Sequence, residues 1–206
     1  MKDCSNIRHL IFDVGDVLLS YRWKDMLIDH GLTEEEALYV GEHVFGNPYW
    51  SIYDYGTEPE EVIIKGLQKI YPEYAEAIEW FITHDELMHL PRPEVFSLVH
   101  ELKQCGYGIY LLSNYPERFF HIHTDDMPFM NDVDGMVISY QVHMVKPDPR
   151  IYQHLLRKYG LKAEECAFFD DRSPNVRAAK KAGFMAFHVR SEAELIKILK
   201  ELRETK

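Results

Sequence analysis

The chain has 206 residues, of which 46% are hydrophobic and 28% are charged, a balance that is typical of a protein with a packed core. It excludes a disordered, collagen-like or disulfide-stapled chain. The 34 acidic and 23 basic residues give a net charge of −11, which repels phosphate backbones and anionic lipid surfaces. We therefore expect no nucleic acid among the partners.

The segment 1–10 is charged and has no apolar run of signal-peptide length, and no uncharged stretch elsewhere approaches the ~20 residues of a membrane span. The three cysteines, Cys4, Cys105 and Cys166, cannot all pair within one chain and show no C-x-x-C spacing. These features predict a soluble, cytoplasmic protein with reduced thiols and no membrane partner. They indicate no particular oligomeric state.

The first predicted element is a short apolar run, His9–Val14, which Gly15 closes. Its length favours a buried parallel strand over a helix. From residue 23 to about residue 89, strand-like runs disappear and about four helices fit the sequence. Two segments there, Thr33–Glu36 and Thr57–Glu60, match the capping box, in which a hydroxyl and a glutamate satisfy each other's backbone donors.

Beyond Pro91 helices and strands alternate, which is typical of a parallel sheet covered on both faces. The predicted strands are 108–112, 135–140, 166–169 and 185–189, and the predicted helices are 93–104, one from 116, 149–159, 174–182 and one capped by Ser191 and Glu194. With the first strand, this order predicts a doubly wound α/β core. We assign residues 1–19 and 90–206 to the core and residues 20–89 to an inserted helical cap.

Chemically active side chains follow the predicted strands at their carboxyl ends, where ligands bind in such sheets. In chain order they are Asp13 and Asp16, Ser113 and Asn114, Lys146, and the pair Asp170 and Asp171. Any one of them would fit a turn, a helix cap or a solvated surface. Their shared position at successive strand ends favours a site. Clustered carboxylates repel one another unless a cation neutralises them, and oxygen-only ligands favour Mg²⁺.

Four segments resemble, in order, the motifs of the haloacid dehalogenase superfamily. They are Phe12–Leu18, Leu112–Asn114, Val145–Pro149 and Phe169–Asn175. The resemblance spans nearly the whole chain and includes a helical insertion between the first and second motifs, as in members with a small cap. Within the superfamily, the chain further resembles the bacterial α-glucose-1-phosphate phosphatases at Ser113–Asn114, Lys146–Pro147, Ile151–His154 and Phe168–Asp171. The resemblance implies a Rossmann-like core and a Mg²⁺-dependent phosphatase of a small phosphorylated metabolite, such as a hexose 1-phosphate.

The resemblance also implies roles in the first and last motifs. Asp13 would be the nucleophile that forms an aspartyl-phosphate. Asp13, the backbone carbonyl of Gly15 and Asp171 would hold Mg²⁺, with Asp170 assisting directly or through water.

The middle motifs would hold the transferring phosphoryl oxygens. Ser113, the backbone N–H of Asn114 and Lys146 place donors and positive charge where negative charge accumulates. Asn175 would fix the loop that carries the acid pair. Arg118 or Arg172 would add positive potential at the pocket.

One position departs from the family pattern. Family members often have a second aspartate two residues after the nucleophile, which acts as acid and then as base, but this chain has Gly15 there and Asp16 one place later. Our hypothesis is that the leaving group is protonated by Asp16, by water or by a cap residue, or that the substrate needs little protonation. An anomeric sugar phosphate fits the last case.

The aromatic segment Asn47–Gly56 supplies candidates for substrate contact, chiefly Trp50 and Asp54, because a movable cap would exclude water from the site. Most of its aromatic residues fit the core of a small cap better. His121 and His123, followed by two aspartates, give a weak alternative signal for a transition-metal site.

Two alternatives to a phosphatase stay open. Carbon-centred hydrolysis, as in the dehalogenases, uses the same nucleophile, but the acid pair Asp170-Asp171 has no obvious use in displacing halide. A ligand- or partner-binding protein with little turnover is the other alternative, and Gly15 is the residue that leaves it open.

Overall fold

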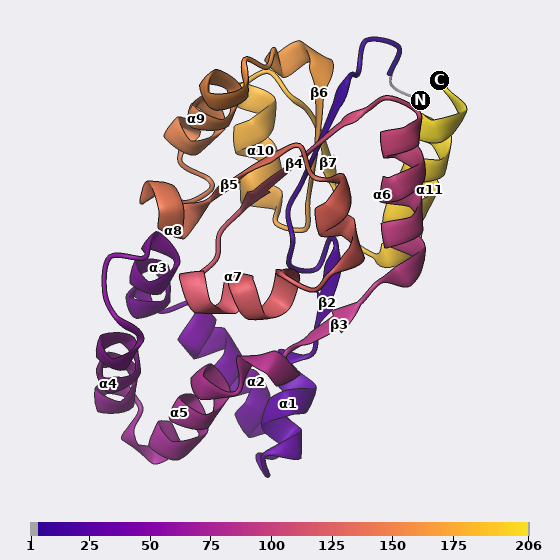
Figure 1. Ribbon diagram of the computed structural model, residues 1–206. Coiled ribbons are helices and arrows are strands. Elements are labelled where there is room, and N and C mark those ends of the chain that lie inside the picture. The colour runs from indigo at the N-terminus through magenta and orange to yellow at the C-terminus, as the bar shows by residue number, and fades with distance from the viewer. Residues whose placement is uncertain (1–3, 206) are drawn as a thin grey trace.

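A five-stranded parallel sheet forms the centre of the computed structural model, which describes residues 4–205 (Figure 1). The strands lie in the order β5-β4-β1-β6-β7. Their bounds are β1 His9–Phe12, β4 Gly108–Ser113, β5 Gly135–Ile138, β6 Cys166–Asp170 and β7 Met185–His188. The predicted doubly wound α/β fold is confirmed. The parts of the predicted core at residues 1–3 and 206 lie outside the described residues.

The central strand β1 contributes to two cores because successive residues of a strand point to opposite faces. Leu10 and Phe12 pack with α6 (Pro93–Gln104) and α11 (Glu192–Glu204). Ile11 packs with α9 (Pro149–Tyr159) and α10 (Ser173–Lys181). Figure 1 shows these two pairs of helices on opposite sides of the sheet. All three side chains are fully buried, so β1 is fixed from both faces.

The chain places β4 and β5 on one side of β1, and β6 and β7 on the other. In such sheets a crevice opens at the carboxyl ends of the strands where the winding reverses, here beside β1. Phe12 pairs with Leu111 of β4 and with Phe169 of β6, so the residues that follow these strands emerge close together. The topology therefore brings three of the four motifs to one crevice.

The sequence predicts about four helices in the inserted segment, and residues 23–83 form five α-helices. In Figure 1 these helices group beyond one end of the sheet. They are α1 Trp23–Asp29, α2 Glu34–Phe45, α3 Pro48–Tyr55, α4 Glu60–Ile70 and α5 Ala75–Thr83. An antiparallel pair, β2 (Leu19–Tyr21) and β3 (His89–Pro91), lies where this segment meets the rest of the chain. Neither short strand is predicted from the sequence. The division into a core and a cap at residues 20–89 remains a prediction.

The capping box is confirmed at α2 and wrong at α4. Thr33 accepts a hydrogen bond from the backbone N–H of Glu36, whose side chain accepts from the N–H of Thr33. Helix α4 begins at Glu60 with Pro59 at its N-cap, and no side chain caps it. The Glu60 carboxylate instead accepts from Arg118 Nη1 at 3.2 Å, so a contact distant in sequence removes it from the predicted box.

The strand predicted at 135–140 ends at Ile138, because Ser139 begins the short helix α8 (Ser139–Val142). The Ser139 hydroxyl accepts from the backbone N–H of Tyr115 at 2.9 Å, a contact that connects α8 to the residues after β4. The next-to-last motif follows α8, and α7 (Glu117–Thr124) follows β4. Across residues 4–205, every helix is too short or too polar to traverse a lipid bilayer.

Candidate active site

Asp13 is the first residue after β1, and 7% of its surface is exposed. Its Oδ1 accepts hydrogen bonds from the backbone N–H of Val14 at 2.8 Å and from the Ser113 hydroxyl at 2.6 Å. The ammonium of Lys146 lies 2.9 Å from its Oδ2. These donors hold both carboxylate oxygens in one orientation, and they bring together three residues from three of the sequence motifs.

Lys146 is buried between two carboxylates. Its Nζ lies 2.9 Å from Asp13 Oδ2 and 2.7 Å from Asp170 Oδ2. Burial lowers the pKa of Lys146, but attraction to Asp13 and Asp170 outweighs burial, so the pKa lies above its ordinary value. Lys146 therefore remains a cation beside Asp13.

The Asn114 side chain holds the backbone of Lys146. Its amide oxygen accepts from the Lys146 N–H at 2.7 Å, and its amide nitrogen donates to the Lys146 carbonyl at 2.9 Å. The second and third motifs are thereby joined through a reciprocal pair of hydrogen bonds. Only the backbone of Asn114 is left to face a substrate, as the sequence analysis expects.

Asp170 has every carboxylate oxygen engaged by the protein. It is fully buried, and it accepts from Lys146, from the backbone N–H of Arg172 at 2.8 Å and from the Asn175 amide at 3.0 and 3.1 Å. Burial, and then repulsion from Asp13, raises the pKa of Asp170, while Lys146 opposes the shift. Asp170 therefore holds the ammonium of Lys146 in place, and Asn175 holds the carboxylate of Asp170.

Asp171 differs from its neighbour. It is partly exposed, and its carboxylate makes no hydrogen bond to any residue in the described range 4–205. Burial, and then repulsion from Asp13 and Asp170, raises the pKa of Asp171. Because the protein makes no hydrogen bond to the Asp171 carboxylate within the described residues, its oxygens are available for a ligand.

The three aspartates could together hold a metal ion. Oxygens of Asp13, Asp170 and Asp171 lie within 4.8 Å of one another. A donor set of oxygens alone, with this much negative charge, fits Mg²⁺. Asp171 offers open acceptor positions, whereas those of Asp170 are already occupied.

Packing requires the glycine at position 15. A Cβ there would lie 2.4 Å from a ring carbon of Tyr21, far inside van der Waals contact. The hydroxyl of Tyr21 donates to that of Tyr115, which lies 3.0 Å from Nδ1 of buried His123. Neither tyrosine is among the residues predicted for the site. Tyr21 lies in β2, a strand that the sequence does not predict, and the only sign of a role for Tyr115 is that it follows Asn114. The Tyr21 ring occupies the space that a side chain at position 15 would enter.

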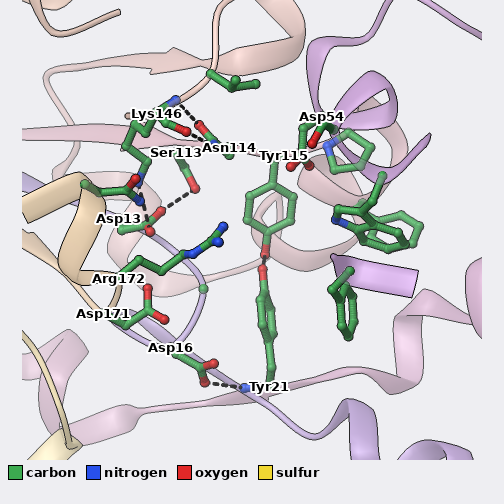
Figure 2. A pocket seen from close by; sticks show the side chains of 18 of the residues that line it. Asp13, Asp16, Tyr21, Asp54, Ser113, Asn114, Tyr115, Lys146, Asp171 and Arg172 are labelled. Carbon is green, nitrogen blue, oxygen red and sulfur yellow. Dashed lines mark hydrogen bonds and ion pairs between the residues drawn. The ribbon is translucent and has the colours of Figure 1, made fainter. Parts of the chain in front are cut away.

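Asp16 is tied to its own loop. It has a left-handed backbone conformation, φ 52°, and its Oδ1 accepts from the backbone N–H of Tyr21 at 3.0 Å. Its backbone carbonyl accepts from Arg92 at 2.9 Å. Burial is the main cause that raises the pKa of Asp16. In Figure 2, Asp171 lies between Asp13 and Asp16, so Asp16 is at the edge of the site.

A cavity of about 590 Å³ lies between the strand ends and the helices beyond them. The residues predicted for catalysis, substrate binding and metal binding all line it, except Asp170, whose carboxylate contacts the ammonium of Lys146. The rest of the lining is largely aromatic and includes Tyr21, Trp23, Phe45, Trp50, Tyr115 and Phe119. Ser51 and Asp54 are its polar members from α3. Figure 2 shows Asp13, Lys146 and Asp171 on one side of this cavity and Asp54 on the other.

Trp50 belongs both to the cavity and to an aromatic cluster. Its ring centroid lies 4.7 Å from that of Phe45 and 5.9 Å from that of Phe119 on α7, both edge to face. Such pairs add stability beyond the area that they bury. Trp50 therefore packs in the aromatic core, as predicted for most aromatic residues of this segment, and it also lines the cavity.

Of the two arginines that are expected at the pocket, Arg118 and Arg172, only one lines the cavity. Arg118 does not line the cavity; it forms ion pairs with Glu60 and, at 2.8 Å, with Asp85. Arg172 does line it, and its guanidinium makes no hydrogen bond within the described part of the chain. Of the two arginines, Arg172 is therefore the one that adds positive charge to the cavity lining.

The histidine metal site is wrong. His121 and His123 lie on helix α7, where residues two apart do not face each other. His123 is buried and bonded to Tyr115 and to the Asp85 carbonyl, whereas His121 is exposed beside Asp125.

The parallel sheet, the carboxylate cluster where its winding reverses and the cavity beside it define a doubly wound α/β protein with an acidic, lysine-containing site. A family model described as haloacid dehalogenase-like hydrolase matches residues 7–183, and the chain belongs to this family of hydrolases.

Comparison with known proteins gives both phosphatase and dehalogenase neighbours. The chain is 28% identical over 188 residues to the sesquiterpene phosphatase astK of Aspergillus oryzae, covering 90% of this chain and 91% of that one. A variant of a haloacid dehalogenase family enzyme from Bacteroides thetaiotaomicron, solved with magnesium and inorganic phosphate, superposes with a TM-score of 0.72 at 18% identity, covering 90% and 95%. A solved dehalogenase superposes with a TM-score of 0.68 at 18% identity, covering 87% and 83%. The two structural likenesses show the fold.

Proposed function

We propose that the protein is a Mg²⁺-dependent phosphatase that acts on a small phosphorylated metabolite. The observation that carries the proposal is the pair of donors, Ser113 and Lys146, on the carboxylate of Asp13 at the floor of the cavity. A hydroxyl and a buried cation suit the oxygens of a phosphoryl group, which carry the negative charge of the ester. The phosphatase among the relatives supports the same class of reaction.

Asp13 would attack phosphorus in line as the ester bond breaks, which gives an aspartyl-phosphate and the free alcohol. Water would then attack phosphorus and release inorganic phosphate together with the Asp13 carboxylate. Ser113 and Lys146 orient the nucleophile before the substrate binds, which lowers the entropic cost of reaching the transition state.

Ser113, the backbone N–H of Asn114 and Lys146 would bind the three transferring oxygens. Asp170 and Asn175 keep Lys146 charged and in place. Arg172 lines the cavity and would attract the anionic substrate.

Asp13, the backbone carbonyl of Gly15 and Asp171 would hold Mg²⁺. When bound, the ion neutralises phosphoryl oxygens and fixes their position. We assign Asp170 an indirect part, because its oxygens already accept from Lys146, Arg172 and Asn175.

For the substrate, a hexose 1-phosphate is one candidate, because its hemiacetal oxygen leaves more easily than an ordinary alcohol. Ser51 and Asp54 would bind sugar hydroxyls, and an aromatic face would pack on the ring. The resemblance to α-glucose-1-phosphate phosphatases supports this candidate. The predominantly aromatic wall and the sesquiterpene phosphatase relative favour a second one, an ester with an apolar organic group.

The test is hydrolysis of p-nitrophenyl phosphate with Mg²⁺ and with a chelator, by the wild type and by Asp13→Asn. We expect turnover with Mg²⁺, loss of turnover in chelator, and a loss on the order of 10⁴-fold in Asp13→Asn. Turnover that Asp13→Asn retains would overturn the proposal. Release of halide from a short 2-haloacid, with no phosphatase activity, would establish carbon-centred hydrolysis instead. A panel of hexose 1- and 6-phosphates and apolar phosphate esters then separates the two substrate candidates.

A further inference from the structure

The proposed reaction needs a proton for the leaving oxygen, and Gly15 does not supply one. Tyr21 fills the space beside Gly15, so no side chain enters the site from that position. Asp16 uses one carboxylate oxygen to hold the N–H of Tyr21 and lies beyond Asp171 as seen from Asp13 (Figure 2). The Tyr21 hydroxyl donates a hydrogen bond to that of Tyr115, and burial raises the pKa of both tyrosines well above its ordinary value.

The direction in which Asp13 attacks phosphorus determines where a proton donor for the leaving oxygen must lie. In an in-line displacement, the attacking and leaving oxygens lie on opposite sides of phosphorus. Because Asp13 forms the floor of the cavity, the leaving oxygen faces the opposite wall. Asp54, in the last turn of α3, is the one carboxyl group on that wall among the residues described. Figure 2 shows it across the cavity from Asp13.

Asp54 is held in place from outside its own helix. Its backbone carbonyl accepts from the hydroxyl of buried Ser139, and Ser139 in turn accepts from the N–H of Tyr115. Tyr115 directly follows Asn114 of the second motif. The position of Asp54 is therefore tied, through two hydrogen bonds, to the strand end that carries Ser113.

The Asp54 carboxyl has no hydrogen bond or ion pair with any residue between 4 and 205, although charged side chains also line the cavity. It also lies at the C-terminal end of a helix, where the helix dipole disfavours negative charge. Burial raises the pKa of Asp54 to about 7; Arg172 opposes the shift, Asp13 adds to it and Lys146 opposes it. A carboxyl group with such a pKa can donate and accept a proton near neutral pH.

We propose that Asp54 is the acid that protonates the leaving oxygen and the base that activates water in the second step. The proposal rests on the phosphatase activity proposed above. In the first step an Asp13 oxygen bonds to phosphorus, the ester P–O bond breaks, and the Asp54 proton moves to the leaving oxygen. In the second step Asp54 takes a proton from water, the water oxygen bonds to phosphorus, and the bond to Asp13 breaks. Inorganic phosphate leaves, and Asp54 is again protonated.

The test measures kcat/KM, with Mg²⁺ present, on substituted phenyl phosphates whose phenols differ in acidity. p-Nitrophenolate leaves without a proton, whereas a weakly acidic phenol needs one. For Asp54→Asn we expect a loss of about 10²-fold or more on the least acidic phenol and less than ~3-fold on p-nitrophenyl phosphate. Asp54→Glu should recover part of the loss. The matched control is Glu61→Gln, which removes an exposed carboxylate from the neighbouring helix α4 and should leave both rates unchanged.

Retained turnover of p-nitrophenyl phosphate also shows that Asp54→Asn is folded. An equal loss on all esters would give Asp54 a structural role and overturn the proposal, as would no loss on any ester. Failure of the wild type on every ester, or activity that survives Asp13→Asn, would instead overturn the phosphatase proposal itself.

Discussion

Two adjacent aspartates, Asp170 and Asp171, have opposite surroundings. Asp170 is buried with all its oxygens engaged, whereas Asp171 is partly exposed and its carboxylate makes no hydrogen bond within residues 4–205. Asp171→Asn should therefore raise the Mg²⁺ concentration for half-maximal activity by ~10-fold or more. Asp170→Asn should lower kcat, because it removes the ion pair that holds Lys146 in place, and should change the Mg²⁺ requirement much less. Mg²⁺ titrations of initial rate measure both.

Asn175 offers the matched control for this comparison. Its side chain donates to both oxygens of Asp170 and, in the described residues 4–205, makes no hydrogen bond to Asp171, so Asn175→Ala should behave as Asp170→Asn does. The same Mg²⁺ dependence for the Asp170 and Asp171 variants would contradict the division between them.

Gly15 and Tyr21 form a second residue-scale pair. A Cβ at position 15 would lie 2.4 Å from the Tyr21 ring, so Gly15→Ala should lower the free energy of unfolding by about 1–3 kcal/mol. In a Tyr21→Leu background the added methyl has room, and the same substitution should cost less than about 0.5 kcal/mol. A double-mutant cycle by urea unfolding measures the difference. Equal costs in the two backgrounds would show that the ring does not set the requirement for glycine.

Residues that ended a predicted strand were identified from the sequence, and residues that depend on distant contacts were not. Asp13, Ser113, Lys146 and Asp171 follow apolar runs, and the motif order predicts that they meet. The position of Tyr21 against Gly15 could not be predicted, because it depends on the pairing of two three-residue strands across the chain. The position of Asp54 depends on a hydrogen bond to its backbone carbonyl from Ser139, which lies 85 residues away.

At the scale of elements, α7 is joined to α4 and to the segment after α5 by Arg118. Its guanidinium pairs with Glu60 at 3.2 Å and with fully buried Asp85 at 2.8 Å. Arg118→Met would leave the Asp85 charge buried without its partner, and should cost about 3–5 kcal/mol of unfolding free energy. Adding Asp85→Asn should recover most of that loss. Urea unfolding of the single and double variants measures this; a double variant as unstable as Arg118→Met would contradict the explanation.

His123 makes the same junction sensitive to acid. Burial lowers the pKa of His123 to about 4, although its hydrogen bond to the Asp85 carbonyl opposes the shift. Because this folded pKa lies below the unfolded value of 6.5, the neutral histidine contributes its full stability above pH 6.5. That stability is lost progressively as the pH falls from 6.5 to 4. The change is about 3 kcal/mol.

The measurement is the free energy of unfolding of the wild type and of His123→Gln between pH 7 and pH 4. We expect the advantage of the wild type to shrink as the pH falls. A difference that stays constant over this range would show that His123 does not titrate in the folded protein.

Elements with strong local boundaries were predicted to the residue. Helix α9 runs from Pro149 to Tyr159 as expected, because Asp148 caps it and Gly160 ends it with φ 65°. The box at Thr57 failed because Glu60 bonds to Arg118 from another helix. Local chemistry predicts an element's ends where no distant partner competes for the capping groups.

At the scale of the whole molecule, part of the net charge of −11 is concentrated at the candidate active site. Asp13, Asp170 and Asp171 gather negative charge at one crevice, and Lys146 offsets part of it. A phosphate ester would meet repulsion there until a divalent cation is bound. The acidity therefore agrees with a phosphate site that depends on metal, and it still disfavours nucleic acid.

The central claim is that Asp13 receives the phosphoryl group. The most direct measurement is acid quenching during turnover of a phosphate ester with Mg²⁺, followed by mass spectrometry of the peptide that contains Asp13. We predict a phosphoryl adduct on Asp13 in the wild type and none in Asp13→Asn or in chelator. Turnover without an adduct on Asp13, or with the adduct on another residue such as Ser113, would contradict the account.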